Sequence, residues 1–108
     1  MKNVIITGAA NGVGKAVAQI LMDENLILID VDNKELEKTA KELNKDYYVC
    51  DLSKANQISE VMSKINEKYD KIDCLINCAG MWISGDMSKL EQPIFDEMNT
   101  LDRIKDVI

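Results

Sequence analysis

Three glycines lie close together in a turn that follows an apolar run at residues 4–7 and precedes a segment with helical spacing. Glycines at such positions let backbone N–H groups approach a ligand, and the positive end of the following helix attracts an anion such as a pyrophosphate. A turn that merely connects two elements is the alternative interpretation. The position between a strand and a helix favours dinucleotide binding. The candidate residues of this turn are Gly8, Asn11, Gly12, Val13 and Gly14.

An acidic residue, Asp30, directly follows the second apolar run of the chain. A carboxylate at this place can accept hydrogen bonds from both hydroxyls of an adenosine ribose, and it repels a 2′-phosphate. Asp30 lies 16 positions after Gly14, a little short of the roughly 20 expected for a dinucleotide site. Asp32 is a weaker candidate for the same role, and a solvated loop acid is the alternative without a function.

Short apolar runs and longer amphipathic stretches must position these residues. The first helical stretch follows Gly14 and is expected to stop at Asn25. The second covers residues 34–43 with Asn33 as its N-cap, and the third begins after a cap at Ser53. The apolar runs that predict strands buried on both faces are residues 4–7, 26–29, 47–50 and 74–77.

Buried strands of this kind belong to parallel sheets, whose strands are joined by helical crossovers. Right-handed crossovers place the first two helices on one face and the third on the other, which gives the strand order 3-2-1-4. The predicted fold is therefore an α/β, Rossmann-type doubly wound parallel sheet, incomplete at its C-terminal side. The chain after residue 81 is expected to form a loop and to become helical from about Thr100. Ligands of such sheets bind beside the carboxyl ends of the strands, where the strand order reverses.

Composition limits the classes of function. The 108 residues, 46% of them hydrophobic, suffice for one domain, residues 1–108, and not for two. A net charge of −6 disfavours nucleic-acid and membrane surfaces. Without histidine the chain lacks the commonest zinc ligand, and no metal site is predicted. Three cysteines, no signal peptide and no apolar run of bilayer length predict reduced thiols in the cytoplasm.

At the glycine turn the chain resembles the short-chain dehydrogenases/reductases, because residues 7–14 match that family's T-G-x-x-x-G-x-G pattern. The resemblance covers essentially the whole chain. It departs from the family's N-N-A-G pattern at one position, where Cys78 replaces the second asparagine. The further matching segments, each at a strand end, are Asp51-Leu52, Lys71-Ile72-Asp73 and Asn77-Cys78-Ala79-Gly80.

The resemblance implies that the adenine of a nicotinamide dinucleotide binds at Asp51 and Leu52. The Asp51 carboxylate can accept from the adenine amino group, and the Leu52 amide can donate to a ring nitrogen. The nicotinamide ribose is expected beside the backbone of Cys78, Ala79 and Gly80, where small residues leave room. Asn77 is expected to tie the fourth strand to its neighbour through its side-chain amide.

NAD is the expected cofactor. Family members that prefer the phosphorylated cofactor often place Arg or Lys just before the second glycine of the turn, or lack an acid after the second strand. Those positions hold Asn11 and Asp30 here.

The catalytic residues of the family are not found in the chain. The resemblance implies a Tyr-x-x-x-Lys pair in which the tyrosinate exchanges a proton with the substrate oxygen. Four residues after the three tyrosines stand Asp51, Leu52 and Asp73, so no catalytic residue is assigned. We expect residues 1–108 to be the NAD-binding part of an oxidoreductase, ending before its catalytic half. Such an enzyme transfers hydride between NAD(H) and an alcohol or ketone.

Two other functions stay open at this point. A naturally short, non-catalytic dinucleotide-binding module would show the same motifs, and so would an epimerase-like or dehydratase-like relative. A homo-oligomer is also a candidate assembly, because the predicted strand at residues 74–77 has an open, apolar edge that a second copy could pair with.

Overall fold

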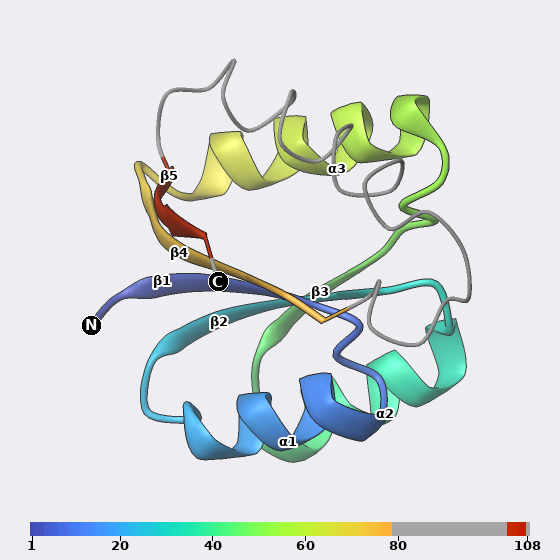
Figure 1. Cartoon of the computed structure of the whole chain (residues 1–108), viewed down its shortest axis with the longest axis vertical. Helices are drawn as coiled ribbons and strands as arrows, with labels where there is room; N and C mark the ends of the chain where they lie inside the picture. Colours follow the sequence, from blue (N-terminus) through green and yellow to red (C-terminus); the bar gives the residue numbers. More distant parts are fainter. Residues whose placement is uncertain (79–103, 108) are drawn as a thin grey trace.

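The computed structural model of the chain describes residues 1–78 and 104–107. In this part of the chain, strands and helices alternate up to the fourth strand, as predicted (Figure 1). The elements are β1 (Asn3–Thr7), α1 (Gly12–Ile20), β2 (Asn25–Asp30), α2 (Asn33–Leu43), β3 (Asp46–Val49), α3 (Ala55–Lys68), β4 (Ile72–Asn77) and β5 (Ile104–Val107).

All pairings between these strands are parallel, in the order β3-β2-β1-β4-β5. Helices α1 and α2 cover one face of the sheet and α3 covers the other (Figure 1). The predicted doubly wound sheet with the order 3-2-1-4 is therefore confirmed. The reversal of strand order lies between β1 and β4, because β2 continues from one edge of β1 and β4 from the other.

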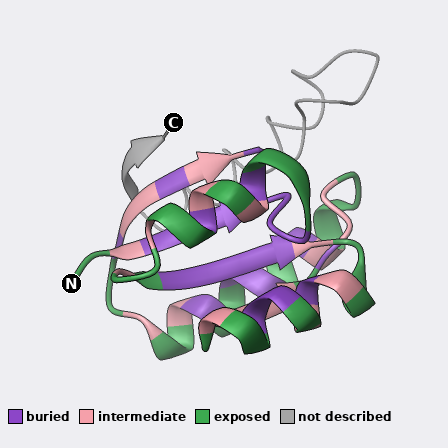
Figure 2. Ribbon diagram, turned by 90° about the horizontal axis from the view of Figure 1, so that it is seen from below, coloured by how far each residue is buried: buried purple, intermediate pink, exposed green. Residues whose placement is uncertain are grey.

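Alternate residues of the strands build two separate core layers. Ile5, Ile27 and Leu75 pack with the inner face of α3, whereas Ile6 and Leu28 pack with α1 and α2. Strands β1 and β2 are buried along almost their whole length and β4 only in part, while exposed residues lie on the outer sides of the helices (Figure 2). Burying each such side chain contributes about 1.5–3 kcal/mol, which explains why the apolar runs are continuous rather than alternating.

Two predicted helix boundaries, the end of α1 and the start of α2, are wrong. Helix α1 ends at Ile20, and Asn25 opens β2 instead of stopping the helix in a left-handed conformation. The left-handed residue is Asn44, at the end of α2, with φ 56°. Asn33 is the first residue of α2 rather than its cap. The cap is Asp32, whose carboxylate accepts from the backbone N–H of Glu35 at 3.2 Å.

The predicted cap of the third helix is also wrong. Helix α3 begins at Ala55, its N-cap is Lys54, and no side chain caps it. The Ser53 hydroxyl donates instead to the Asp51 carboxylate, at 2.6 Å. The Asp51 carboxylate, two residues upstream, is a strong charged acceptor for the serine hydroxyl, so this hydroxyl is not used to cap the helix.

The chain at residues 104–107 forms β5, not the predicted helix, and it pairs with β4. Its two apolar residues, Ile104 and Val107, lie three positions apart, a spacing typical of a helix, but four residues are too few for periodicity to decide between helix and strand. The unpaired edge of β4 offers hydrogen-bonding groups that favour the strand. The open β4 edge predicted from the sequence is therefore occupied by the chain itself.

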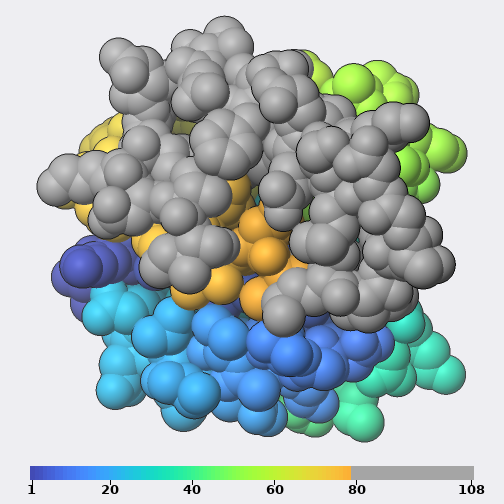
Figure 3. All heavy atoms as spheres, in the orientation of Figure 1, coloured from blue at the N-terminus to red at the C-terminus, as the bar shows by residue number. Residues whose placement is uncertain are grey.

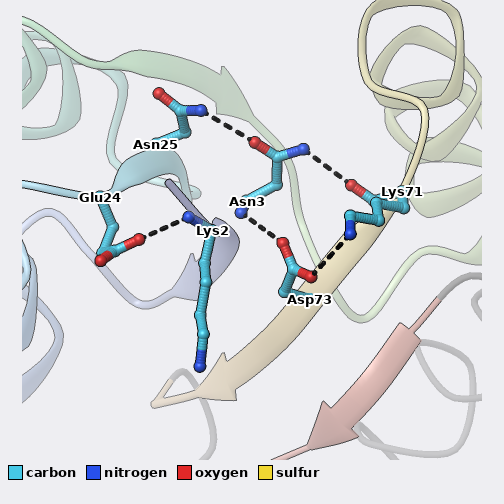
Figure 4. A network of polar contacts seen from close by, with 6 residues as sticks. All are labelled: Lys2, Asn3, Glu24, Asn25, Lys71 and Asp73. Atoms are coloured by element: carbon cyan, nitrogen blue, oxygen red, sulfur yellow. Dashed lines mark hydrogen bonds and ion pairs between the residues drawn. The ribbon is translucent and has the colours of Figure 1, made fainter.

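A polar network joins the amino ends of the strands, opposite the glycine turn (Figure 4). The Asn3 backbone N–H donates to Asp73 at 2.8 Å, and its side-chain amide donates to the Lys71 carbonyl at 2.9 Å. The Asn25 side chain donates to the Asn3 side chain at 3.1 Å. Asn3 thus holds the start of β1 against both neighbouring strands, and this fixes their register.

None of the helices in the part of the chain that the structure describes is long and apolar enough to cross a lipid bilayer.

Candidate functional site

The candidate residues collect at one edge of the sheet because all its strands run in the same direction. The glycine turn follows β1, Asp30 ends β2, the segment beginning at Cys50 follows β3, and Asn77 ends β4. On the face seen in Figure 3, the orange atoms of β4 lie next to the blue atoms around α1. The edge formed by the carboxyl ends of the strands is where ligands of open α/β sheets bind.

The three glycines serve two different physical needs. Gly8 and Gly12 have φ angles of 67° and 59°, in the region that favours residues without a side chain. Gly14 lies at a close approach, since a Cβ built on it would stand 2.1 Å from the carbonyl oxygen of Gly8. At Gly12, by contrast, no atom of the described residues lies within 4 Å of such a Cβ. As far as residues 1–78 are concerned, the backbone at Gly12 therefore faces open space, which fits the approach of a ligand.

Within the part of the chain that the structure describes, the N-terminus of α1 has no side-chain cap. Its N-cap residue is Asn11, whose side chain makes no capping hydrogen bond, and the first turn contains no acidic residue. Helix α2 is the internal comparison, because Asp32 caps it and Glu35 adds a negative charge to its first turn. The first N–H groups of a helix need partners. The amino end of α1 is thus arranged to receive an anion.

Asp30 connects the second strand to the glycine turn. One carboxylate oxygen accepts from the Ala10 backbone N–H at 2.9 Å. The other accepts from the backbone N–H groups of Val31 and Asp32 at 2.7 and 3.1 Å. A carboxylate offers about four acceptor positions. Three are used, so Asp30 has room for about one ribose hydroxyl without losing a backbone partner, rather than for both. Asp32, the weaker candidate for this role, caps α2 through one of its carboxylate oxygens.

The segment after β3 is ordered around Asp51. The Ser53 hydroxyl and backbone N–H both donate to the same Asp51 oxygen, and these bonds hold the pKa of the carboxyl below its usual range. The Asp51 backbone N–H donates to the Gln57 side chain at 2.8 Å. The Cys50 backbone N–H donates to the Asp30 carbonyl at 2.9 Å. Asp51 is therefore charged at neutral pH and linked to the end of β2, while Leu52 packs against the core beneath it.

Thr7 joins the end of β1 to the end of β4. Its hydroxyl donates to the Asn77 side-chain oxygen at 2.6 Å and accepts from the Cys78 backbone N–H at 3.1 Å. Asn77 thus ties β4 to its neighbour, as expected, although through its oxygen as an acceptor. Cys78 presents its backbone here, and burial raises the pKa of its thiol. The candidates Ala79 and Gly80 lie outside the described residues.

Replacing the Thr7 hydroxyl is expected to destabilise the junction of β1 and β4. In Thr7→Val the shape is kept, but the Asn77 oxygen and the Cys78 N–H lose their partner. The expected loss is about 2–4 kcal/mol of unfolding free energy. Urea unfolding followed by circular dichroism measures it. Thr7→Ser is the matched control because it keeps the hydroxyl, and equal losses in both variants would contradict this role for the hydrogen bonds.

Sequence reasoning missed three residues that shape this site. Thr7 was part of the glycine-turn pattern but was given no role. Thr39, fully buried on α2, donates from its hydroxyl to the Ala10 carbonyl at 3.3 Å. A signal for it exists, since a hydroxyl on the apolar stripe of a helix needs a partner. Gln57, the partner of Asp51, carries no such signal in the sequence.

Among residues 1–78 and 104–107, no group of three or more His, Cys, Asp or Glu residues is placed to hold a metal ion.

The fold and the glycine turn together define a Rossmann-type domain of the dinucleotide-binding kind. The family model described as short chain dehydrogenase matches residues 2–102. The chain therefore belongs to the short-chain dehydrogenase family, whose members are oxidoreductases that use a nicotinamide dinucleotide.

Individual relatives agree with this assignment. The chain is 37% identical over 87 residues to 3-oxoacyl-[acyl-carrier-protein] reductase FabG of Thermotoga maritima, an alignment that covers 74% of this chain and 35% of the relative. The structure of a short-chain dehydrogenase/reductase from Burkholderia phymatum in complex with NAD matches with a TM-score of 0.65. That match has 28% identity and covers 69% of this chain and 29% of the other.

A second solved structure shows a different cofactor. An alcohol dehydrogenase from the archaeon Thermococcus sibiricus, complexed with 5-hydroxy-NADP, matches with a TM-score of 0.65 and 34% identity. This match covers 70% of the present chain and 36% of that one. The chain spans 37%, 35% and 39% of the lengths of three curated relatives. Its sheet is accordingly not a complete sheet of this family.

Proposed function

We propose that residues 1–108 form the dinucleotide-binding domain of an oxidoreductase that transfers hydride between NAD(H) and a small hydroxyl or carbonyl compound. When bound, the nicotinamide supplies the hydride or accepts it. The residues of this chain bind and orient the dinucleotide. The oxidoreductases among the relatives favour this function over a non-catalytic module or an epimerase-like enzyme.

The observation that carries the proposal is the uncapped amino end of α1 beside open space at Gly12. Backbone N–H groups without a side-chain cap, together with the positive helix end, attract a pyrophosphate. No acidic residue in the first turn of α1 competes for these groups. Asp30, held to the same turn through Ala10, then offers its remaining acceptor position to the adenosine ribose.

The other candidate residues extend the site along the sheet edge. Asp51 and Leu52 are proposed to contact the adenine, since the Asp51 carboxylate is charged and one of its oxygens is not used by Ser53. The nicotinamide ribose is proposed to lie by the backbone of residues 78–80. Thr7 supports this proposal because it holds the Cys78 backbone at the end of β4.

NAD is proposed as the preferred cofactor over NADP. The neighbours of known structure hold either one, so the preference rests on the residues of this chain. A 2′-phosphate would lie close to the Asp30 carboxylate, and like charges repel strongly where water is partly excluded. Asn11 offers no positive charge to compensate.

Titration calorimetry of the purified chain is expected to show NAD binding at least about tenfold tighter than NADP, a difference of ~1.4 kcal/mol. In Asp30→Ala this gap should narrow. This variant also removes the acceptor of the Ala10 N–H, which should weaken the binding of both cofactors. The difference in affinity should therefore narrow mainly because NAD binds more weakly, and less because NADP binds more tightly. Glu24→Ala serves as a control, because it removes one negative charge at the opposite end of the sheet. Equal affinities of the unmodified chain for the two cofactors would contradict the proposed preference.

A reducing, cytoplasmic compartment is also proposed, and the three free cysteines support it. Burial raises the pKa of the Cys50 thiol to about 11, which suits an unreactive core residue. A homo-oligomer stays a proposal, although the edge of β4 no longer argues for it because β5 occupies that edge.

A further inference from the structure

Three consecutive peptide groups of the glycine turn are held by residues of β2 and α2. The Ala9 N–H donates to the Ile29 carbonyl at 3.2 Å, and the Ala10 N–H donates to Asp30 at 2.9 Å. The Ala10 carbonyl accepts from the Thr39 hydroxyl at 3.3 Å. The second strand and helix therefore determine how the turn between the first strand and helix is oriented.

Thr39 differs from an ordinary helical threonine. A threonine within a helix commonly donates its hydroxyl to the carbonyl one turn earlier in the same helix. The Thr39 hydroxyl instead donates out of α2 to the Ala10 carbonyl. The side chain is fully buried, on the stripe that also contains Leu36 and Ala40. A buried hydroxyl without a partner is costly, so the packing of α2 against the turn depends on this hydrogen bond.

The planarity of the peptide bond carries the effect of Thr39 one residue further. The Ala10 carbonyl and the Asn11 N–H belong to the same rigid trans peptide group, in which they point in opposite directions. Since the carbonyl is held toward α2, the Asn11 N–H points away from α2. Asn11 is exposed and is the N-cap of α1. Its N–H thus joins the first N–H groups of that helix, which no side chain of residues 1–78 caps.

We propose that Thr39 is a positioning residue for the dinucleotide, because it holds the Ala10 carbonyl and so directs the Asn11 N–H toward the pyrophosphate. The inference rests on the proposed function. It assigns to α2 a part in cofactor binding that does not require α2 to contact the cofactor. It also predicts that the hydroxyl of Thr39, rather than its volume, matters for affinity.

The test compares three variants of the purified chain by titration calorimetry with NAD and with ADP, which carries the pyrophosphate without the nicotinamide. Thr39→Val removes the hydroxyl and keeps the shape, and should weaken both ligands about tenfold. Thr39→Ser restores the hydroxyl and should bind within about twofold of the unmodified chain. Ala40→Gly, the matched control, weakens α2 through backbone entropy and leaves the hydrogen bond in place. It should bind like the unmodified chain.

Thermal unfolding of the same proteins separates positioning from stability. If Thr39→Val and Ala40→Gly lose affinity in proportion to their loss in melting temperature, Thr39 has a merely structural role and the inference is overturned. Unchanged affinity in Thr39→Val, or no rescue in Thr39→Ser, overturns it too. If the unmodified chain binds neither NAD nor ADP, the proposed function fails and the inference fails with it. Binding by the unmodified chain with no effect of Thr39→Val overturns the inference alone.

Discussion

Gly14→Ala is expected to lower the free energy of unfolding by about 2–3 kcal/mol and to abolish measurable dinucleotide binding. The added Cβ would stand 2.1 Å from the oxygen and 2.6 Å from the carbon of the Gly8 carbonyl group. Both are backbone atoms and cannot rotate aside, so α1 must move away from the turn. Alanine favours a helix over glycine by about 1 kcal/mol, and this gain offsets only part of the loss.

Gly12→Ala is the matched comparison, because its Cβ meets no atom of the described residues within 4 Å. The φ of 59° still disfavours alanine by about 1–2 kcal/mol. This variant should fold and should bind the dinucleotide more weakly, since the methyl group occupies the open space in front of the turn. Chemical denaturation and calorimetry measure both effects. A Gly14→Ala protein as stable as the unmodified chain would show that the turn and α1 are not packed as closely as described.

The purified 108-residue chain is expected to show no dehydrogenase turnover with alcohols or ketones. A positioned acid or base contributes roughly 10²–10⁴ to such a rate, and the catalytic tyrosine must give up its proton readily. Tyr69 is unsuited to this, because burial and hydrogen bonding to Asp46 raise the pKa of its hydroxyl. It also lies beside the first residue of β3, at the amino ends of the strands and opposite the site. Tyr47 and Tyr48 pack against the two core layers.

The measurement follows NADH absorbance with a panel of substrates. Turnover that persists after repurification, at a rate proportional to the protein concentration, would contradict the expectation. Tyr69→Phe then identifies the source, because a rate that falls in this variant would assign catalysis to Tyr69 despite its raised pKa. A rate unchanged in Tyr69→Phe would direct attention to another group of the chain.

The sequence by itself determined the order of the elements and the topology of the sheet up to β4. Short continuous runs rich in leucine and isoleucine, such as residues 26–29, favour strands covered on both faces. The stripe of Ile58, Val61, Met62 and Ile65 fits only a helix, and these residues do line the inner face of α3. The handedness of crossovers then leaves few ways to connect such elements, so the strand order followed without any knowledge of contacts.

The glycine turn could also be predicted from the sequence, because its local backbone geometry admits few residue types. The positive φ angles of Gly8 and Gly12 are a property of the turn itself. Asp30 was predicted as a site residue for a similar reason, as an acid at the end of a buried strand. Its hydrogen bond to Ala10 was not, because that contact joins residues 20 positions apart.

Only the tertiary structure decided the features that depend on distant partners. Residues 104–107 have the apolar spacing of a helix but are too few to assign in isolation, and the free hydrogen-bonding edge of β4 selects the strand. The roles of Thr7 and Thr39 come from acceptors or donors 70 and 29 positions away in the chain. A hydroxyl shows in the sequence that it needs a partner when buried, but not which one. The packing of whole helices and strands decides which partner the hydroxyl meets. Here that packing sets the orientation of the peptide groups in the glycine turn.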